Sequence, residues 1–116
     1  MVMFNDRDGE NIVLCGANSY ERKFYINEQF DALPQSIKDE LKIMCVLYTE
    51  EVGGILTLEF EEEGSLVFKS IADDSDYLYD EISAGLKIKQ IQQTKDELLQ
   101  SLELYFKVFY LGEDVE

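Results

Sequence analysis

Residues 53–71 read Gly-Gly-Ile-Leu-Thr-Leu-Glu-Phe-Glu-Glu-Glu-Gly-Ser-Leu-Val-Phe-Lys-Ser-Ile, and they predict a β-hairpin. Apolar residues alternate with less apolar ones along both arms, which is the period of strands that are covered on one face. Residues 61–64 close the hairpin, because Gly64 tolerates the positive φ that such turns require. The covered face would carry Leu56, Leu58, Phe60, Leu66 and Phe68.

Upstream, the pattern predicts another hairpin. Residues 12–15 form a short, partly β-branched run. In the segment 20–27, Phe24 and Ile26 would lie on one face, with Lys23, Tyr25 and Asn27 on the other. Residues 16–19 between them are of types that favour turns. Two hairpins of this kind predict a four-stranded, mainly antiparallel sheet.

A helix is predicted between Pro34 and the pair Gly53-Gly54. Proline suits the first turn of a helix, where its missing N–H has no partner, and glycine readily adopts the left-handed conformation that ends one. Apolar residues recur between them at intervals of three or four: Ile37, Leu41, Met44, Cys45, Tyr48 and Val52. The stripe is wider than that of a typical surface helix, because three more apolar residues flank it: Ile43, Val46 and Leu47.

The remaining chain predicts helices at residues 75–90 and 94–111, or one long helix that bends between them. Asp74 or Ser75 is placed to cap the first helix. Residues 94–97, Thr-Lys-Asp-Glu, form a capping-box pattern for the second.

The last of these helices is apolar over most of its circumference. Its polar residues form one stripe, in which the last two are spaced to pair: Asp96, Gln100, Glu103 and Lys107. A helix of this kind must be covered on most sides. Two alternatives stay open: the sheet and the preceding helix cover it, or the chain forms a homodimer through this C-terminal helix.

These elements fit a single domain over residues 1–116, with flexible ends at 1–10 and 112–116. The predicted fold class is α+β, with two β-hairpins forming a four-stranded, mainly antiparallel sheet and two to three helices packed on one face. No segment is long and apolar enough to cross a membrane, and the N-terminus resembles no secretion signal. We therefore expect a cytoplasmic protein in which Cys15 and Cys45 are free thiols.

Charge is the strongest feature of the composition, because ten Lys and Arg residues against 25 Asp and Glu residues give a net charge of −15. Such a field repels phosphate backbones and anionic lipids, so we expect neither direct nucleic-acid binding nor membrane binding. It would speed association with a basic protein, which is the partner that we expect if the charge has a function. The alternative is that the charge serves solubility alone.

The sequence contains no histidine, which excludes a Ser-His-Asp triad and a Cys–His pair within the chain. Residues 74–76, Asp-Ser-Asp, open like an EF-hand loop but are not followed by the remaining ligands. Cys15 lies beside a predicted turn without a base to activate it, which favours a buried core cysteine. We therefore predict no catalytic residue, no metal site and no cofactor.

One segment combines acidic and aromatic residues and is the best candidate for contact with a partner. Tyrosine offers a large contact area with a polar tip, and the carboxylates would pair with Lys or Arg of the partner. The alternative is that the tyrosines pack inward over the edge of the sheet. The candidate residues are Asp73, Asp74, Asp76, Tyr77, Tyr79, Asp80 and Glu81.

Three stretches carry a resemblance to a family. They are residues 13–21 (Val-Leu-Cys-Gly-Ala-Asn-Ser-Tyr-Glu), residues 37–60 (Ile-Lys-Asp-Glu-Leu-Lys-Ile-Met-Cys-Val-Leu-Tyr-Thr-Glu-Glu-Val-Gly-Gly-Ile-Leu-Thr-Leu-Glu-Phe) and residues 105–112 (Tyr-Phe-Lys-Val-Phe-Tyr-Leu-Gly). They resemble a family of small acidic proteins, a domain of unknown function, from anaerobic Gram-positive bacteria of the gut. The resemblance implies a bacterial cytoplasmic protein and transfers no site, because the family has no assigned activity.

Three classes of function stay open. The leading one is a non-enzymatic interaction or regulatory protein whose acidic surface binds a basic partner. The second is a mimic of nucleic-acid charge that occupies a DNA- or RNA-binding protein. The third is a small-ligand binder or enzyme that uses carboxylates, tyrosines or Cys15 around a pocket.

Overall fold

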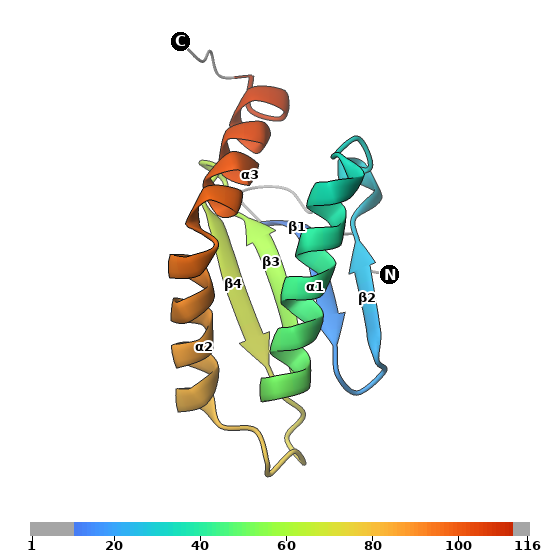
Figure 1. Cartoon of the computed structure of the whole chain (residues 1–116), viewed down its shortest axis with the longest axis vertical. Coiled ribbons are helices and arrows are strands. Elements are labelled where there is room, and N and C mark those ends of the chain that lie inside the picture. The colour runs from blue at the N-terminus through green and yellow to red at the C-terminus, as the bar shows by residue number, and fades with distance from the viewer. Residues whose placement is uncertain (1–10, 113–116) are drawn as a thin grey trace.

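The two predicted hairpins form one antiparallel sheet in the computed structural model, which describes residues 11–112 (Figure 1). The strands are β1 (Ile12–Asn18), β2 (Lys23–Ile26), β3 (Ile55–Phe60) and β4 (Leu66–Ile71). Their order across the sheet is β2-β1-β3-β4, so the antiparallel pairing of β1 with β3 joins the two hairpins. The predicted α+β fold is confirmed. The ends predicted to be flexible, 1–10 and 112–116, lie outside the described residues apart from Gly112.

The β3–β4 hairpin follows the predicted alternation. Leu56, Leu58 and Phe60 are buried under the helices, whereas the residues between them lie on the opposite face and are partly exposed. Gly64 has the predicted positive φ, 107°. A Cβ at this position would also lie 2.8 Å from Cγ of Lys107, so the turn requires glycine for both reasons.

The first hairpin differs from its prediction at the turn. Gly16 and Ala17, which were expected in the turn, continue β1 and pair with both neighbouring strands. A Cβ at Gly16 would overlap the hydroxyl of Tyr25, so this glycine is required by a close approach within the sheet. The turn itself comprises residues 19–22, in which Arg22 adopts a left-handed φ of 56°.

Helix α1 (Gln35–Val52) lies over the middle of the sheet and has the predicted limits (Figure 1). Pro34 precedes its first turn, and Gly53 ends it with a φ of 86°. Its buried residues are Leu41, Met44, Cys45, Tyr48 and Thr49. The wider apolar stripe is only partly covered, because Ile43 and Leu47 are exposed.

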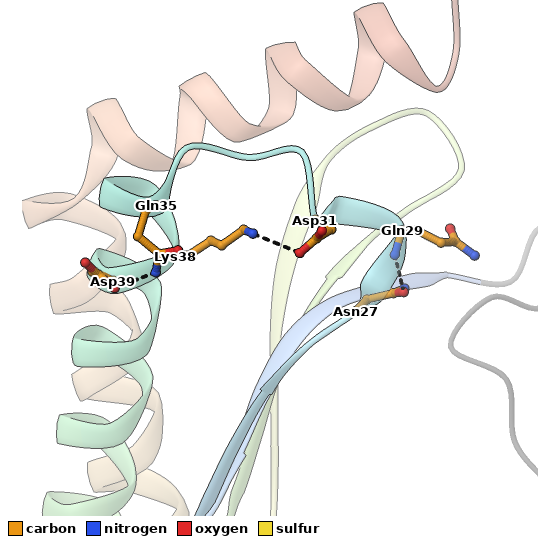
Figure 2. Close-up of polar contacts among 6 residues, drawn as sticks. All are labelled: Asn27, Gln29, Asp31, Gln35, Lys38 and Asp39. Carbon is orange, nitrogen blue, oxygen red and sulfur yellow. Dashed lines mark hydrogen bonds and ion pairs between the residues drawn. The ribbon is translucent and has the colours of Figure 1, made fainter.

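A short connection fixes the start of α1 relative to the sheet (Figure 2). The 3-10 helix η1 (Glu28–Phe30) is capped by Asn27, whose side-chain oxygen accepts a hydrogen bond from the N–H of Gln29 at 2.9 Å. The side-chain amide nitrogen of Asn27 donates to the backbone carbonyl of Val13 in β1 at 2.8 Å. Lys38 of α1 then pairs with Asp31 at 3.0 Å, which ties the helix to the connection.

Two helices, α2 (Glu81–Thr94) and α3 (Asp96–Phe109), follow β4 and are separated at Lys95. The two-helix alternative is therefore confirmed. They run along the β4 side of the sheet, beside α1 (Figure 1). Two ion pairs join them to α1, between Lys87 and Glu51 at 3.0 Å and between Lys95 and Glu40 at 3.2 Å.

The caps of these helices differ from the predicted ones. Asp80 caps α2 in place of Asp74 or Ser75, because the residues before Asp80 fold as a loop. The predicted capping box of α3 does not form. The hydroxyl of Thr94 donates back into α2, and Lys95 precedes α3 without a side-chain cap bond.

The predicted pairing of Glu103 with Lys107 is also wrong. The carboxylate of Glu103 accepts a hydrogen bond from the N–H of Leu66 at 2.8 Å. Leu66 lies on the edge strand β4, where an outward N–H has no strand to pair with. This bond therefore attaches α3 to the edge of the sheet.

Aromatic rings bring α3 into the core. Phe106 of α3 stacks on Phe60 of β3, with ring centres 4.3 Å apart, and on Tyr110 at 5.1 Å. Phe30 of η1 lies 5.5 Å from Phe60. One aromatic cluster thus joins the sheet, the η1 connection and the C-terminal helix.

Candidate functional site

The seven candidate residues lie in the connection between β4 and α2 and at the first residue of α2. We name residues 72–80 the β4–α2 loop. It lies at one end of the molecule, opposite the end at which α3 finishes (Figure 1). The residues are therefore brought together by the chain itself, and the question is which of their groups stay free.

Local hydrogen bonds hold two carboxylates of the loop. Asp73 accepts hydrogen bonds from the N–H and the hydroxyl of Ser75, both at 3.0 Å, and Asp76 accepts one from the N–H of Leu78 at 3.1 Å. The backbone bond from Ser75, followed by the hydroxyl bond, lowers the pKa of Asp73 below its usual value. Asp73 is thus ionised at neutral pH and also shapes the loop.

Of the remaining candidate acids, one is bonded by neighbouring residues and two make no such bond. The hydroxyl of Ser83 and the N–H of Ile82 donate to Asp80 at 2.8 and 3.0 Å, and these bonds lower the pKa of Asp80. Asp74 and Glu81 are exposed and have no hydrogen-bond or ion-pair partner for their side chains in the described part of the chain. These two carboxylates are available to a partner.

Tyr20 ties the loop to the first hairpin. Its hydroxyl donates to Asp76 at 2.6 Å and accepts from the N–H of Asp73 at 3.0 Å. The bond to Asp76 raises the pKa of Tyr20. Sequence reasoning missed this residue, because Tyr20 lies 53 positions before Asp73 and no local pattern links the two segments.

The two tyrosines of the candidate set have different environments. Tyr77 is 92% exposed, and its neighbour Leu78 is 94% exposed. Tyr79 instead packs against the core, and its hydroxyl lies 2.8 Å from the hydroxyl of Ser70, which also accepts a bond from Tyr48 at 2.7 Å. Tyr79 therefore packs inward, as the alternative interpretation expected, whereas Tyr77 points outward and is accessible to a partner.

Exposed apolar residues flank the loop on both sides. Ile71 ends β4, and Ile82 and Leu86 are spaced four apart in α2, so they share one side of that helix. Sequence reasoning missed them, because apolar residues in a strand or helix are normally assigned to the core. Together with Tyr77 and Leu78 they place apolar side chains among the acids.

Helix α3 is covered on one side by its own chain. Its buried residues are Leu98, Leu99, Leu102 and Phe106. Leu104 is exposed, and Phe109 is 71% exposed. Because part of its apolar surface stays open, a homodimer through this helix stays a prediction.

The cysteines form a buried pair. Cys15 of β1 and Cys45 of α1 are fully buried, with their sulfur atoms 4.0 Å apart. The hydrogen bond with Cys45 and burial raise the pKa of the Cys15 thiol well above its usual value. These observations argue against Cys15 as a nucleophile.

Two other classes of site, metal centres and membrane spans, concern residues 11–112. No three His, Cys, Asp or Glu side chains there are grouped so as to hold a metal ion. In the same residues, no helix has the length and apolarity needed to span a membrane.

Comparisons with other proteins place the chain in a family. No curated protein and no solved structure matches it. A family model does match, and it covers residues 11–114, which is nearly the whole chain. The protein therefore belongs to a family of unknown function, DUF6145.

Proposed function

We propose that the protein is a non-enzymatic interaction module of the bacterial cytoplasm, which binds a basic, partly apolar segment of a partner protein at the β4–α2 loop. The observation that carries the proposal is the nearly complete exposure of Tyr77 and Leu78 on a loop held by hydrogen bonds. Apolar side chains in this position leave water only when a partner covers them.

The loop is ordered before any partner arrives. Asp73 and Asp76 accept bonds from its own backbone, and Tyr20 fastens it to the first hairpin. An ordered loop loses less conformational entropy on binding than a flexible one, so more of the contact energy appears as affinity. Tyr77 is also of a residue type that is enriched among the side chains that dominate binding energy.

Charge determines the class of partner. The side chains of Asp74 and Glu81 have no partner among residues 11–112, and the other acids of the loop add to the negative field around Tyr77 and Leu78. Lys and Arg side chains would pair with these acids, whereas a second copy of the same surface would be repelled. Binding is therefore expected to weaken as salt concentration rises.

A pull-down with matched variants tests the proposal. The tagged full chain is mixed with source-cell lysate and washed at low and high salt, and the retained protein is then purified and tested for direct binding. We expect a basic protein that high salt releases. Tyr77→Ser with Leu78→Ser is expected to abolish the binding and leave thermal stability unchanged, because neither side chain packs against the fold.

Charge reversal supplies the second arm of this test. Asp74→Lys with Glu81→Lys removes two carboxylates that make no bond within the described part of the chain, and it is expected to weaken binding. Glu62→Lys with Glu97→Lys makes the same change in charge at exposed acids elsewhere and is the matched control. Equal losses in both pairs, or retention that salt does not affect, would contradict the proposal. Competition between this protein and nucleic acid for one partner site would favour the charge mimic instead.

A further inference from the structure

A pocket of about 670 Å³ lies between α1 and the first hairpin, at the β2 edge of the sheet. Three basic side chains line it, from three different elements: Arg22 from the β1–β2 turn, Lys23 from β2 and Lys42 from α1. Arg22 and Lys23 are neighbours in the sequence, and the fold brings the distant Lys42 to the same pocket.

These cations have no ion-pair partner among residues 11–112, although the protein has 25 acids and ten bases. Four of the six other lysines in the described chain pair with carboxylates at 3.0–3.2 Å: Lys38, Lys69, Lys87 and Lys95. Lys89 and Lys107 form no ion pair with the described residues either, but neither lines this pocket. The side chains of Arg22, Lys23 and Lys42 make no ion pair or hydrogen bond with the described residues. Three cations that share a pocket with only one carboxylate, Glu50, repel one another, and a bound anion would offset that repulsion.

The rest of the lining separates into an apolar part and a polar part. Phe24 and Val46 are partly buried and provide apolar walls. The hydroxyl of buried Thr49 donates to carbonyls of its own helix, so it can only accept a hydrogen bond from a ligand. Glu50 is the one carboxylate in the lining, against three cations. The pocket is thus locally cationic within an anionic protein, with an apolar wall beside the charges.

We propose that this pocket binds a small organic molecule that carries a phosphate group. Arg22, Lys23 and Lys42 hold the phosphate, and Phe24 and Val46 contact the organic part. A phosphate monoester carries close to two negative charges at neutral pH, which suits three cations better than a single carboxylate does. The guanidinium of Arg22 can also bond two phosphate oxygens at once. The inference is independent of the proposed function, because the pocket shares no residue with the β4–α2 loop.

The backbone of Arg22 gives a separate reason to look for a role of its side chain. Its φ of 56° lies in the left-handed region, which glycine adopts freely and most other residues do not. A turn selected for stability alone would carry glycine or asparagine there. Arg22→Gly therefore removes the guanidinium and at the same time relaxes the backbone.

A titration of the full chain with adenosine monophosphate, followed by amide NMR spectra, tests the pocket. We expect the amides of residues 19–24 and 42–50 to shift on binding in the millimolar range or tighter. Adenosine without phosphate is expected to bind at least about tenfold more weakly. Inorganic phosphate is expected to move the same amides. The proposal is overturned if neither phosphate compound moves them at millimolar concentration, or if succinate binds more tightly than inorganic phosphate.

Variants separate a bound ligand from a general response to charge. Arg22→Gly and Lys42→Ala are each expected to weaken the binding of adenosine monophosphate about tenfold, with circular dichroism unchanged. Lys89→Ala is the matched control, because Lys89 is an exposed lysine of α2 that lies outside the pocket and forms no ion pair with the described residues. An equal loss in this control would show that the nucleotide responds only to net charge, and the proposal would then be wrong.

Discussion

The β4–α2 loop and the cationic pocket meet at one turn, residues 19–22, and they use their polar groups in opposite ways. Tyr20 of this turn bonds to the loop, and Arg22 lines the pocket. In the loop most acids accept hydrogen bonds that shape the backbone, which leaves Tyr77 and Leu78 as its least engaged side chains. In the pocket the apolar residues are partly buried, and the cations make no ion pair or hydrogen bond with residues 11–112. Side chains that contribute no bond to the fold among the described residues, Tyr77 and Leu78 in the loop and the cations in the pocket, are therefore the candidates for binding.

The largest expected effect separates Tyr79 from Tyr77. Tyr79→Ala removes a ring that packs against the core and a hydroxyl that bonds to Ser70, so we expect a loss of about 2 kcal/mol in the free energy of unfolding. Tyr77→Ala is expected to change it by less than about 0.5 kcal/mol, because the side chain contacts almost nothing. Urea denaturation of both variants gives the comparison. Similar losses would show that Tyr77 also packs, which would remove it as a contact residue.

A gain in stability is expected at Arg22, the residue of the 19–22 turn that lines the pocket. Arg22→Gly places glycine at a left-handed position, and we expect the free energy of unfolding to rise by about 0.5–1 kcal/mol. Glu21→Gly is the control, since Glu21 has no positive φ and its replacement is expected to bring no gain. The midpoints of urea unfolding measure both. If Arg22→Gly is instead destabilising, the arginine serves the fold, and the argument for its functional retention is lost.

The hairpins, the helix ends and the pocket show what the sequence can and cannot predict. The β3–β4 hairpin follows from local alternation, and the limits of α1 follow from Pro34 and Gly53, because each signal lies within its own segment. The cap of α2 does not follow, since several acids precede it and only the folded loop selects Asp80. Gly16 is of a residue type that favours turns, but glycine is needed at this position because Tyr25 of the next strand approaches it closely. The pocket could not be predicted either, because Arg22 and Lys42 meet only through the packing of α1 on the first hairpin.

A smaller effect, on amide exchange, is expected when the hydrogen bonds between Tyr20 and the β4–α2 loop are removed. Tyr20→Phe removes the hydroxyl that bonds to Asp73 and Asp76 while keeping the ring. We expect faster amide exchange in residues 73–78, because the loop opens more often without this tie. Affinity at the pocket is expected to stay unchanged. Tyr77→Phe, which removes a hydroxyl that makes no bond within the described residues, is the control. Equal exchange rates in the two variants would mean that the loop is held by its internal bonds alone.

The smallest expected effect is the dependence of stability on acid pH. The pKa values of Asp73 and Asp80 are lowered in the folded protein, so the unfolded chain binds protons at higher pH than the folded chain does. Their contribution is complete above the usual aspartate pKa of about 4 and is lost as pH falls through the lower folded values. Asp73→Asn with Asp80→Asn keeps an acceptor oxygen at each site but no longer titrates. The urea midpoint of this variant is therefore expected to fall less steeply below about pH 4 than that of the wild type.

A matched pair of substitutions separates this local effect from net charge. Glu62→Gln with Glu97→Gln removes the same number of charges from exposed positions outside the loop. This pair could reduce the fall of the urea midpoint at acid pH as much as the aspartate pair does. The pH dependence would then report only the relief of repulsion in a chain of net charge −15. If only the aspartate pair reduces the pH dependence of the urea midpoint, the carboxylates of the loop are bound to their own backbone in solution. The binding surface around Tyr77 would then be ordered by its own acids before a partner arrives.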